Sequence, residues 1–229
     1  MARAARGTLT REVILEAALA LVDEVGLEHL SMRTLAQRLG VQAMSLYNHV
    51  AGKGALLDGL QERLTLEVIV PESGDEPWPE TLRRAAAAYR VVALAHPRAF
   101  VLLATRPLST PAAIAHVAPI LTAVASSGFG PGQGMLLLNV FFTFLNGYLL
   151  AEVAPVPGHA DVPGPDTAGA FRAALATGDL SRDVIALAEA GASADEPGGL
   201  APLFSRAVDL VIAGLQTLVP DRPAGTRRG

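Results

Sequence analysis

The sequence contains no cysteine, which excludes disulfide bonds, thiolate metal sites and cysteine nucleophiles. Aromatic residues make up only 5% of the 229 residues, and no segment alternates apolar and polar residues for long enough to predict a β-strand. Apolar residues instead make up 51% of the chain, with alanine, leucine and valine prominent. This composition and length predict an all-α protein that can bury a sizeable core.

Positive charge and targeting signals are also sparse. The formal net charge is −4, so bulk charge does not hold this chain on nucleic acid. Any such contact must come from locally placed cations, namely Arg3, Arg6, Arg11, Arg33 and Lys53. The N-terminal arginines are not followed by the apolar segment of a signal peptide. Together with the absence of cysteine, this leads us to expect a protein of the reducing cytoplasm.

The longest apolar run, residues 135–151, falls just short of the length of a membrane span. It also contains three polar residues, Asn139, Thr143 and Asn146. We therefore expect a buried helix at this position and no membrane partner.

Signatures of catalysis are missing as well. The five histidines show no metal-ligand spacing, and no Gly-x-Ser-x-Gly elbow is present. The glycine-rich segment 128–134 follows a predicted helix and lacks the Lys-Ser/Thr ending of a phosphate loop, so we interpret it as a turn. We expect no enzymatic activity, no metal and no cofactor.

Residues 31–53 carry the most informative pattern. Ser31 can cap a short helix whose apolar stripe is formed by Met32, Leu35, Ala36 and Leu39. Gly40 follows at once, where a tight turn needs an unusual backbone conformation. Val41 and Leu46 can then hold a second short helix against the first. This pattern predicts a helix-turn-helix, whose second helix lies in the DNA major groove.

Other helical hairpins share this apolar pattern without contacting DNA, so the outward residues matter. Those of the second helix are short or hydrogen-bonding groups suited to base edges and phosphates. Lys53 opens the next helix, where the positive helix dipole disfavours a cation unless an anion such as a DNA phosphate binds there. The alternative for Lys53 is a solvated surface lysine. The candidate DNA-binding residues are Ser31, Arg33, Thr34, Gln42, Ala43, Met44, Ser45, Tyr47, Asn48, His49 and Lys53.

Residues 9–70 resemble the N-terminal domain of the tetracycline-repressor (TetR) family, most specifically at Leu-Tyr-Asn-His-Val (46–50) and Lys-x-x-Leu-Leu-Asp (53–58). The resemblance continues at 76–78, 104–107 and 210–215, which are similar to segments of the tetracycline repressors. It implies a three-helix DNA-binding head at 1–52, a linking helix at 53–70, and a larger helical domain at 71–229 for effector binding and dimerisation.

The remaining helices are predicted from apolar periodicity and turn residues. A first helix begins after its cap Thr10 and ends at Gly26. Later helices are expected at 79–95, 98–105, 110–127, 132–152, near 180–190, and at 201–219. The Pro- and Gly-rich segment 153–169 is expected to be a loop or disordered, and the tail after Pro220 to be loose.

The helices at 132–152 and 201–219 are apolar over more than one face. In the last helix this wide arc comprises Leu203, Phe204, Val208, Val211, Ile212, Leu215 and Leu218. Such helices are either central to a core or part of an interface. The resemblance implies the second reading, a four-helix interface in a homodimer that binds a near-palindromic operator. The alternative is ordinary core burial in a monomer.

The ligand site is where the chain departs from the tetracycline repressors. Their drug is read by a histidine ending helix four and an asparagine in helix five, and a histidine after helix six binds the drug's metal. The corresponding positions here are Ile69, Ala85 and Leu102, which argues against tetracycline and its magnesium. An apolar cavity for a mostly hydrophobic ligand remains. The candidate ligand-binding residues are Ile69, Ala85, Tyr89, Phe100, Leu102, Thr105, Phe141 and Phe142, with Phe144 as a further wall; for each, the alternative is a core position.

These patterns predict a dimeric transcriptional regulator, most simply a repressor that a small, largely apolar effector releases from operator DNA. A helical carrier or enzyme using the same apolar cavity, with a merely structural hairpin, is the alternative. Mobility shifts on the DNA upstream of the gene would separate the two.

Overall fold

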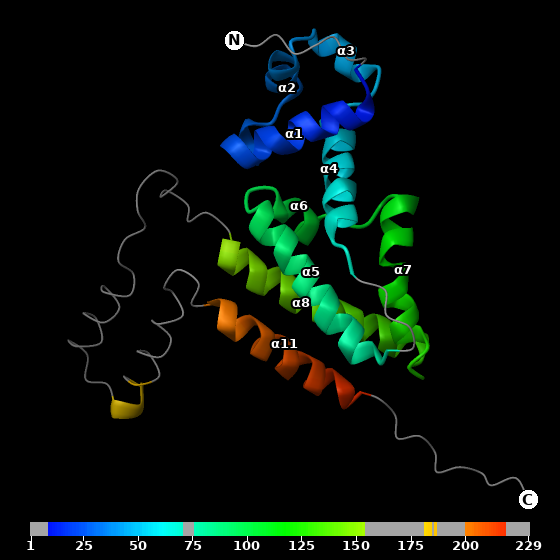
Figure 1. Cartoon of the computed structure of the whole chain (residues 1–229), viewed down its shortest axis with the longest axis vertical. Helices are drawn as coiled ribbons and strands as arrows, with labels where there is room; N and C mark the ends of the chain where they lie inside the picture. Colours follow the sequence, from blue (N-terminus) through cyan, green and yellow to red (C-terminus); the bar gives the residue numbers. More distant parts are fainter. Residues whose placement is uncertain (1–8, 71–75, 154–180, 185, 187–199, 219–229) are drawn as a thin grey trace, which may run out of the picture.

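The structure is a computed structural model that describes residues 9–70, 76–153, 181–184, 186 and 200–218. Within these ranges every regular element is helical, which confirms the all-α prediction. Figure 1 shows a head of α1, α2 and α3, a helix α4 that leads away from it, and a larger body. The loop predicted at 153–169 (apart from Val153), most of the helix predicted near 180–190, and the tail after Pro220 lie outside the described residues.

The elements of the head are α1 (Arg11–Val25), a 3-10 turn (Leu27–His29), α2 (Met32–Leu39) and α3 (Ala43–Tyr47). Two of them begin at side-chain caps. The Thr10 hydroxyl accepts from the Val13 N–H at 3.3 Å. The Ser31 hydroxyl accepts from the Thr34 N–H at 3.1 Å, and the Thr34 hydroxyl accepts from the Ser31 N–H at 3.0 Å. This capping box satisfies N–H groups that have no partner inside α2.

The turn between α2 and α3 depends on a glycine. Leu35, Ala36 and Leu46 are at most 3% exposed and join the two helices. Gly40 adopts a left-handed conformation (φ +67°), and the next residue, Val41, donates its N–H to the Ala36 carbonyl at 3.0 Å. A Cβ at Gly40 would meet no atom within 4 Å, so backbone conformation alone favours glycine here.

We expect Gly40→Ala to lower the free energy of unfolding by about 1 kcal/mol, because a side chain in the left-handed region costs about 1–2 kcal/mol. Gly40→Asn should cost less, since asparagine tolerates this conformation. Chemical denaturation at one fixed protein concentration measures both variants. Equal losses in the two variants, or no loss in either, would contradict this account of the turn.

α4 (Lys53–Glu67) links the head to the body. It packs against α1 in the head and against α6 and α7 in the body, and Leu60 and Leu64 at its centre are fully buried. The helix ends three residues before the predicted position 70. The reason is that Val68 leaves the helical region (ψ 77°) and donates its N–H to the Thr65 carbonyl at 3.1 Å.

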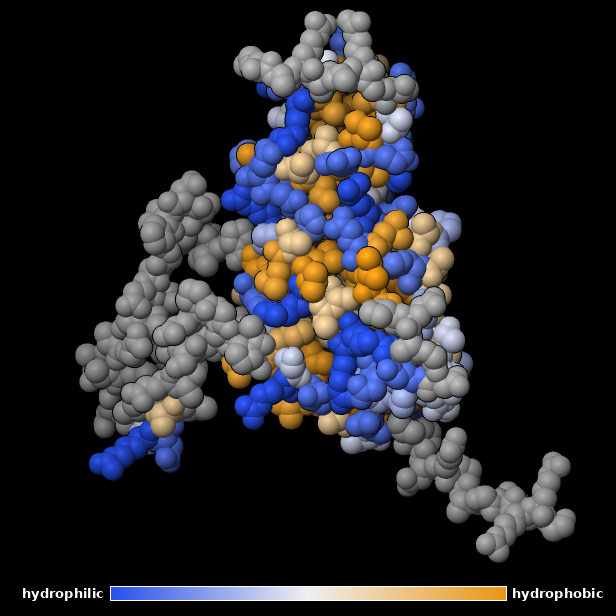
Figure 2. All heavy atoms as spheres, viewed as in Figure 1, coloured by the Kyte–Doolittle hydropathy of each residue, from blue (hydrophilic) through white to orange (hydrophobic). Residues whose placement is uncertain are grey.

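The body consists of α5 (Trp78–Ala95), α6 (Phe100–Thr105), α7 (Pro111–Ala125), α8 (Pro131–Val153) and α11 (Leu200–Gln216). α8 contacts each of the other four, and it runs beside α11 in the opposite direction (Figure 1). Phe141, Leu145 and Leu149 of α8 are fully buried. On the face shown in Figure 2, hydrophobic residues gather over the body between bands of hydrophilic residues.

Among the described residues, α8 is the helix that is long and apolar enough to cross a membrane. Its most apolar 18-residue window has a mean hydropathy of 1.6, and 33% of that window is buried inside the structure. The helices packed on α8 bury one side of it, so the helix that the sequence predicted to be buried is only partly buried. Leu136 (52% exposed) and Val140 (44% exposed) leave it with an uncovered apolar face.

Candidate functional site

The first candidate site is the surface formed by α3 and the turn that follows it. Met44 (72% exposed) and Tyr47 (48% exposed) project from this helix, while Leu46 is buried and holds it in place. Gln42, Asn48, His49 and Lys53 are exposed around them, and Ala43 and Ser45 are half-buried. The residues predicted for the second helix therefore lie on a surface that offers hydrogen-bonding and apolar groups.

Two of the predicted residues at the start of α2 also cap that helix. Ser31 and Thr34 use their hydroxyls in the capping box, so they fix where α2 begins, whereas Arg33 is exposed. Of the cations expected to act locally, Arg11 is paired with Glu62 of α4 at 3.7 Å. Arg3 and Arg6 lie outside the described residues.

Lys53 begins α4 directly after this surface. The N-cap residue is Gly52 (φ +135°), and no side chain caps the helix. The first-turn N–H groups and the Lys53 ammonium are thus positive groups at the same helix end. Such an end binds anions, including phosphate.

A charged joint ties the head to the body at the turn after α5. His96 bonds Asp23 of α1 through Nδ1 (2.8 Å) and Glu67 of α4 through Nε2 (2.9 Å). Within the head, Arg38 donates two hydrogen bonds of 2.6 Å to Glu24, which holds the pKa of that carboxyl below its usual range. Sequence reasoning missed the joint at His96 because Asp23, Glu67 and His96 lie far apart in the chain.

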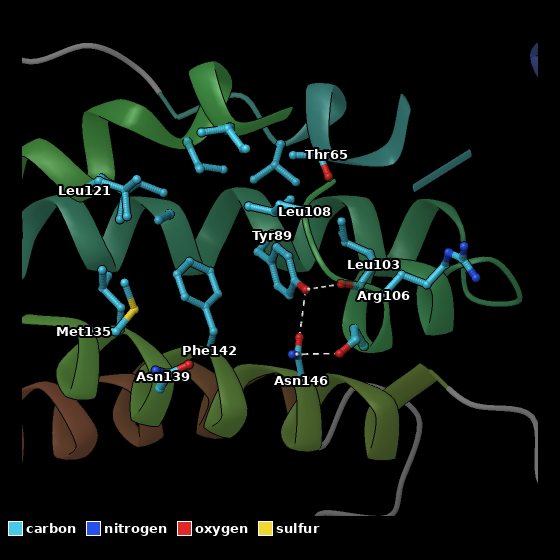
Figure 3. Close-up of a pocket in the computed structure, with 17 residues that line it drawn as sticks. Thr65, Tyr89, Leu103, Arg106, Leu108, Leu121, Met135, Asn139, Phe142 and Asn146 are labelled. Carbon is cyan, nitrogen blue, oxygen red and sulfur yellow. Dashed lines mark hydrogen bonds between the residues drawn. The ribbon is translucent and has the colours of Figure 1, made fainter. Parts of the chain in front are cut away.

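The second candidate site is a cavity of about 480 Å³ where α4, α5, α6, α7 and α8 meet (Figure 3). Its size and mostly apolar wall are those of sites for largely hydrophobic small molecules. α4 supplies Thr65, the residue that caps its end supplies Val68, and α5 supplies Ala85 and Tyr89. The rest of the wall comprises Leu103, Ala104, Arg106, Leu108, Ile114, Val117, Ile120, Leu121, Met135, Leu138, Asn139, Phe142 and Asn146.

A short polar network crosses the cavity wall between α5, α6 and α8. The Tyr89 hydroxyl donates to Asn146 Oδ1 at 2.7 Å, and Asn146 Nδ2 donates to the Ala104 carbonyl at 3.1 Å (Figure 3). Burial raises the pKa of Tyr89, so its phenol stays protonated near neutral pH. The one charged residue in the described wall, Arg106, pairs its guanidinium with Asp58 of α4.

Three of the predicted ligand-binding residues, Ala85, Tyr89 and Phe142, line this cavity. The predicted Ile69, Phe100, Leu102, Thr105, Phe141 and Phe144 do not. Ile69 lies beyond the end of α4 and is 71% exposed. Thr105 is exposed, and its hydroxyl donates to the Val101 carbonyl at 2.6 Å.

The other corrected positions also lie outside the cavity wall. Phe100, Leu102 and Phe141 are at most 4% exposed. The Phe100 ring packs edge-on against the Tyr89 ring, with 5.4 Å between centroids, so it positions a wall residue without being one. Phe144 packs against Tyr148 at 5.8 Å. In α6 the cavity face is formed by Leu103 and Ala104, next to the predicted position.

Sequence reasoning also missed the contribution of α7 and of two asparagines. α7 is apolar on most sides, so its pattern did not identify a cavity face. Asn139 and Asn146, however, are seven residues apart in an otherwise apolar helix, which places both on one helix face. That spacing was available as a signal in the sequence.

Two family models match the chain. The model described as bacterial regulatory proteins, tetR family, matches residues 14–60, which span most of the head and the first half of α4. The model described as tetracyclin repressor-like, C-terminal domain, matches residues 70–219, which include the body and most of the cavity wall.

Curated relatives and solved structures agree with these models. An HTH-type transcriptional regulator of Saccharopolyspora erythraea is 33% identical over 207 residues, covering 90% of this chain and 84% of the relative. The class A tetracycline repressor protein from transposon 1721 of Escherichia coli is 31% identical over 227 residues, covering 96% and 98%. The structure of Streptomyces coelicolor ActR in complex with actinorhodin has a TM-score of 0.77 at 26% identity, covering 94% of this chain and 100% of that one. The chain therefore belongs to the tetR family of bacterial regulatory proteins and is a DNA-binding transcriptional regulator, not an enzyme.

Proposed function

We propose that this regulator is a repressor and that a small, largely apolar molecule releases it from its operator. One observation carries the proposal: α4 begins at the proposed DNA-reading surface and ends in the cavity wall, which includes Thr65 of its last turn and its C-cap residue Val68. A ligand in the cavity therefore contacts the helix that carries the head. The complex of ActR with actinorhodin supports a small-molecule effector for this fold.

Two contacts support a route from the cavity to the head. His116 of α7, the helix that forms one wall, donates from Nε2 to the Val68 carbonyl at the end of α4 (2.9 Å). His96 holds Asp23 of the head and Glu67 of α4 together. A ligand that favours one arrangement of these helices shifts the population toward it, with a coupling free energy of about 1–3 kcal/mol in typical cases.

This route assigns a role to each part of the chain. We assign residues 1–52 to DNA binding, 53–70 to the linking helix, and 71–229 to effector binding and dimerisation. We propose a homodimer through the exposed apolar faces of α8 and α11, since a helix-turn-helix head reads a near-palindromic operator as a dimer. In this proposal the dimer acts on double-stranded operator DNA in the cytoplasm, with no membrane partner, metal or cofactor.

The proposed DNA binding is tested with duplex DNA from upstream of the regulator's own gene. Fluorescence anisotropy and mobility shift measure the affinity. Tyr47→Ala and Lys53→Ala should each weaken binding to all duplexes by about 1–2 kcal/mol, because they remove phosphate contacts. Gln42→Ala and Ser45→Ala should instead relax the preference at one base position, because they remove contacts to base edges.

Val13→Ala is the matched control, since Val13 is an exposed apolar residue of the head (42%) on α1. It should bind operator like the parent. If all four test variants also bound like the parent, α3 would not be the recognition helix, and the proposed function would lose its DNA contact surface.

A further inference from the structure

One face of α8 presents two amides to the cavity, with an aromatic ring between them. Asn139, Phe142 and Asn146 all line the cavity, and spacings of three and four residues place them along one helix face (Figure 3). Seven residues at 1.5 Å each separate the two asparagines by about 10 Å along the helix axis. The wall between them is apolar and is formed by Phe142.

The amide of Asn146, at the C-terminal end of this row, already makes two hydrogen bonds within the protein. Asn146 accepts from Tyr89 and donates one Nδ2 hydrogen to the Ala104 carbonyl, so its second N–H remains for a ligand. The Tyr89 oxygen keeps a lone pair. A hydroxyl group fits this pair, since it can accept from Asn146 and donate to Tyr89.

The amide at the other end, that of Asn139, has no hydrogen-bond partner among the described residues, although this residue lines the cavity. It is exposed, beside Met135 on the same wall. Its carbonyl oxygen and both N–H hydrogens are therefore available to a polar group of a ligand.

The charge of the wall limits the ligand further. Among the described residues that line the cavity, there is no aspartate, glutamate, lysine or histidine. The Arg106 guanidinium is paired with Asp58, and in Figure 3 its side chain extends away from Tyr89 and Phe142. Burial of an unpaired charge is costly, so an uncharged ligand suits this wall.

We propose that Asn139 and Asn146 read the two polar ends of an uncharged, elongated effector whose apolar middle packs on Phe142. The polar groups of this effector lie about 10 Å apart, matching the spacing of the two amides on α8. This inference rests on the proposed function, because it concerns the same cavity. It adds a specificity-determining residue, Asn139, and a size and polarity for the ligand.

Two rigid probes of the same width test the spacing. Biphenyl-4,4′-diol carries a hydroxyl at each end, and 4-phenylphenol carries one. Calorimetric titration of the full-length protein should give about tenfold tighter binding of the diol, as expected for one additional satisfied hydrogen bond. Asn139→Leu should reduce this ratio to about one, mainly by weakening the diol, and should leave 4-phenylphenol within about twofold of the parent value.

Gln133→Leu is the matched control, because it removes an exposed amide from the same helix outside the cavity wall. It should keep the tenfold ratio. The inference that Asn139 and Asn146 bind the two ends of the effector is overturned if the parent binds both probes equally. It is also overturned if the affinity ratio survives Asn139→Leu. Neither result contradicts the binding of a small molecule in the cavity. If neither probe binds the parent, the inferred spacing of polar groups is contradicted, whereas the proposed function is judged by the operator-binding measurements above.

Discussion

Leu210→Asp should convert the proposed dimer into a monomer and abolish specific operator binding. Leu210 is 75% exposed, the highest value for a large hydrophobic residue in the described part of the chain. Leu203 on the same helix and Leu136 and Val140 on α8 are also more than 40% exposed. In the proposed interface these side chains are covered by a second copy, and an unpaired carboxylate buried there costs several kcal/mol.

The loss of DNA binding follows from the loss of the second head. Two linked heads on one operator gain a factor of about 10²–10⁴ in affinity over one head. Operator affinity of the variant should therefore fall at least about a hundredfold, although each head remains folded. Sedimentation or light scattering at micromolar concentration reports the assembly, and mobility shift reports the affinity.

Ile69→Asp provides the matched control. Ile69 is nearly as exposed (71%) but lies beyond the end of α4, outside α8 and α11, so this variant should remain a dimer. Leu215→Asp is a poor test, since Leu215 is 4% exposed and faces the core of its own protomer. A parent protein that is already monomeric at micromolar concentration would exclude the proposed interface.

The difference between Leu210 and Leu215 illustrates the limits of sequence reasoning. The apolar content of 201–219 predicted that this helix makes contacts on more than one side. It did not identify which side faces the protomer and which faces outward, because both are apolar. Only the packing of α11 on α5 and α8 separates the two sides.

The head was more predictable because its signals are local. Ser31 and Gly40 act through hydrogen bonds and backbone angles within four residues, so their roles follow from the sequence itself. Helix ends were less accurate: α6 begins at Phe100, not at 98, and α4 ends at Glu67, not at 70. The joint at His96 depends on a bond to Asp23 across 73 residues, and no local pattern predicts it.

The cavity was predictable from the sequence only in part. Its existence was implied by the resemblance to the tetracycline repressors, and Ala85, Tyr89 and Phe142 were identified among its walls. The assignment failed at Leu102 and Thr105 because a one-residue rotation of α6 exchanges its buried and cavity-facing positions. Such rotations are fixed by packing against α4 and α8, which periodicity in a six-residue helix cannot define.

Tetracycline with magnesium should not release this regulator from its operator. The three positions that correspond to the drug- and metal-reading residues of tetracycline repressors offer no suitable group: Ile69 is outside the cavity, Ala85 has no hydrogen-bonding side chain, and Leu102 is buried in the core. The described wall also contains no histidine or carboxylate to hold the metal. Each polar group of the drug left unpaired on burial costs about 1–3 kcal/mol.

Calorimetric titration with tetracycline, with and without magnesium, measures this directly, and the class A repressor serves as the positive control in the same buffers. We expect no heat of specific binding to the present protein and no change in its mobility shift at drug concentrations that fully release the control. Tight, magnesium-dependent binding would mean that groups outside the described wall complete a metal site, and it would also contradict an uncharged effector. Absence of tetracycline binding together with diol-selective binding of biphenyl probes would instead assign effector choice to the amides of α8.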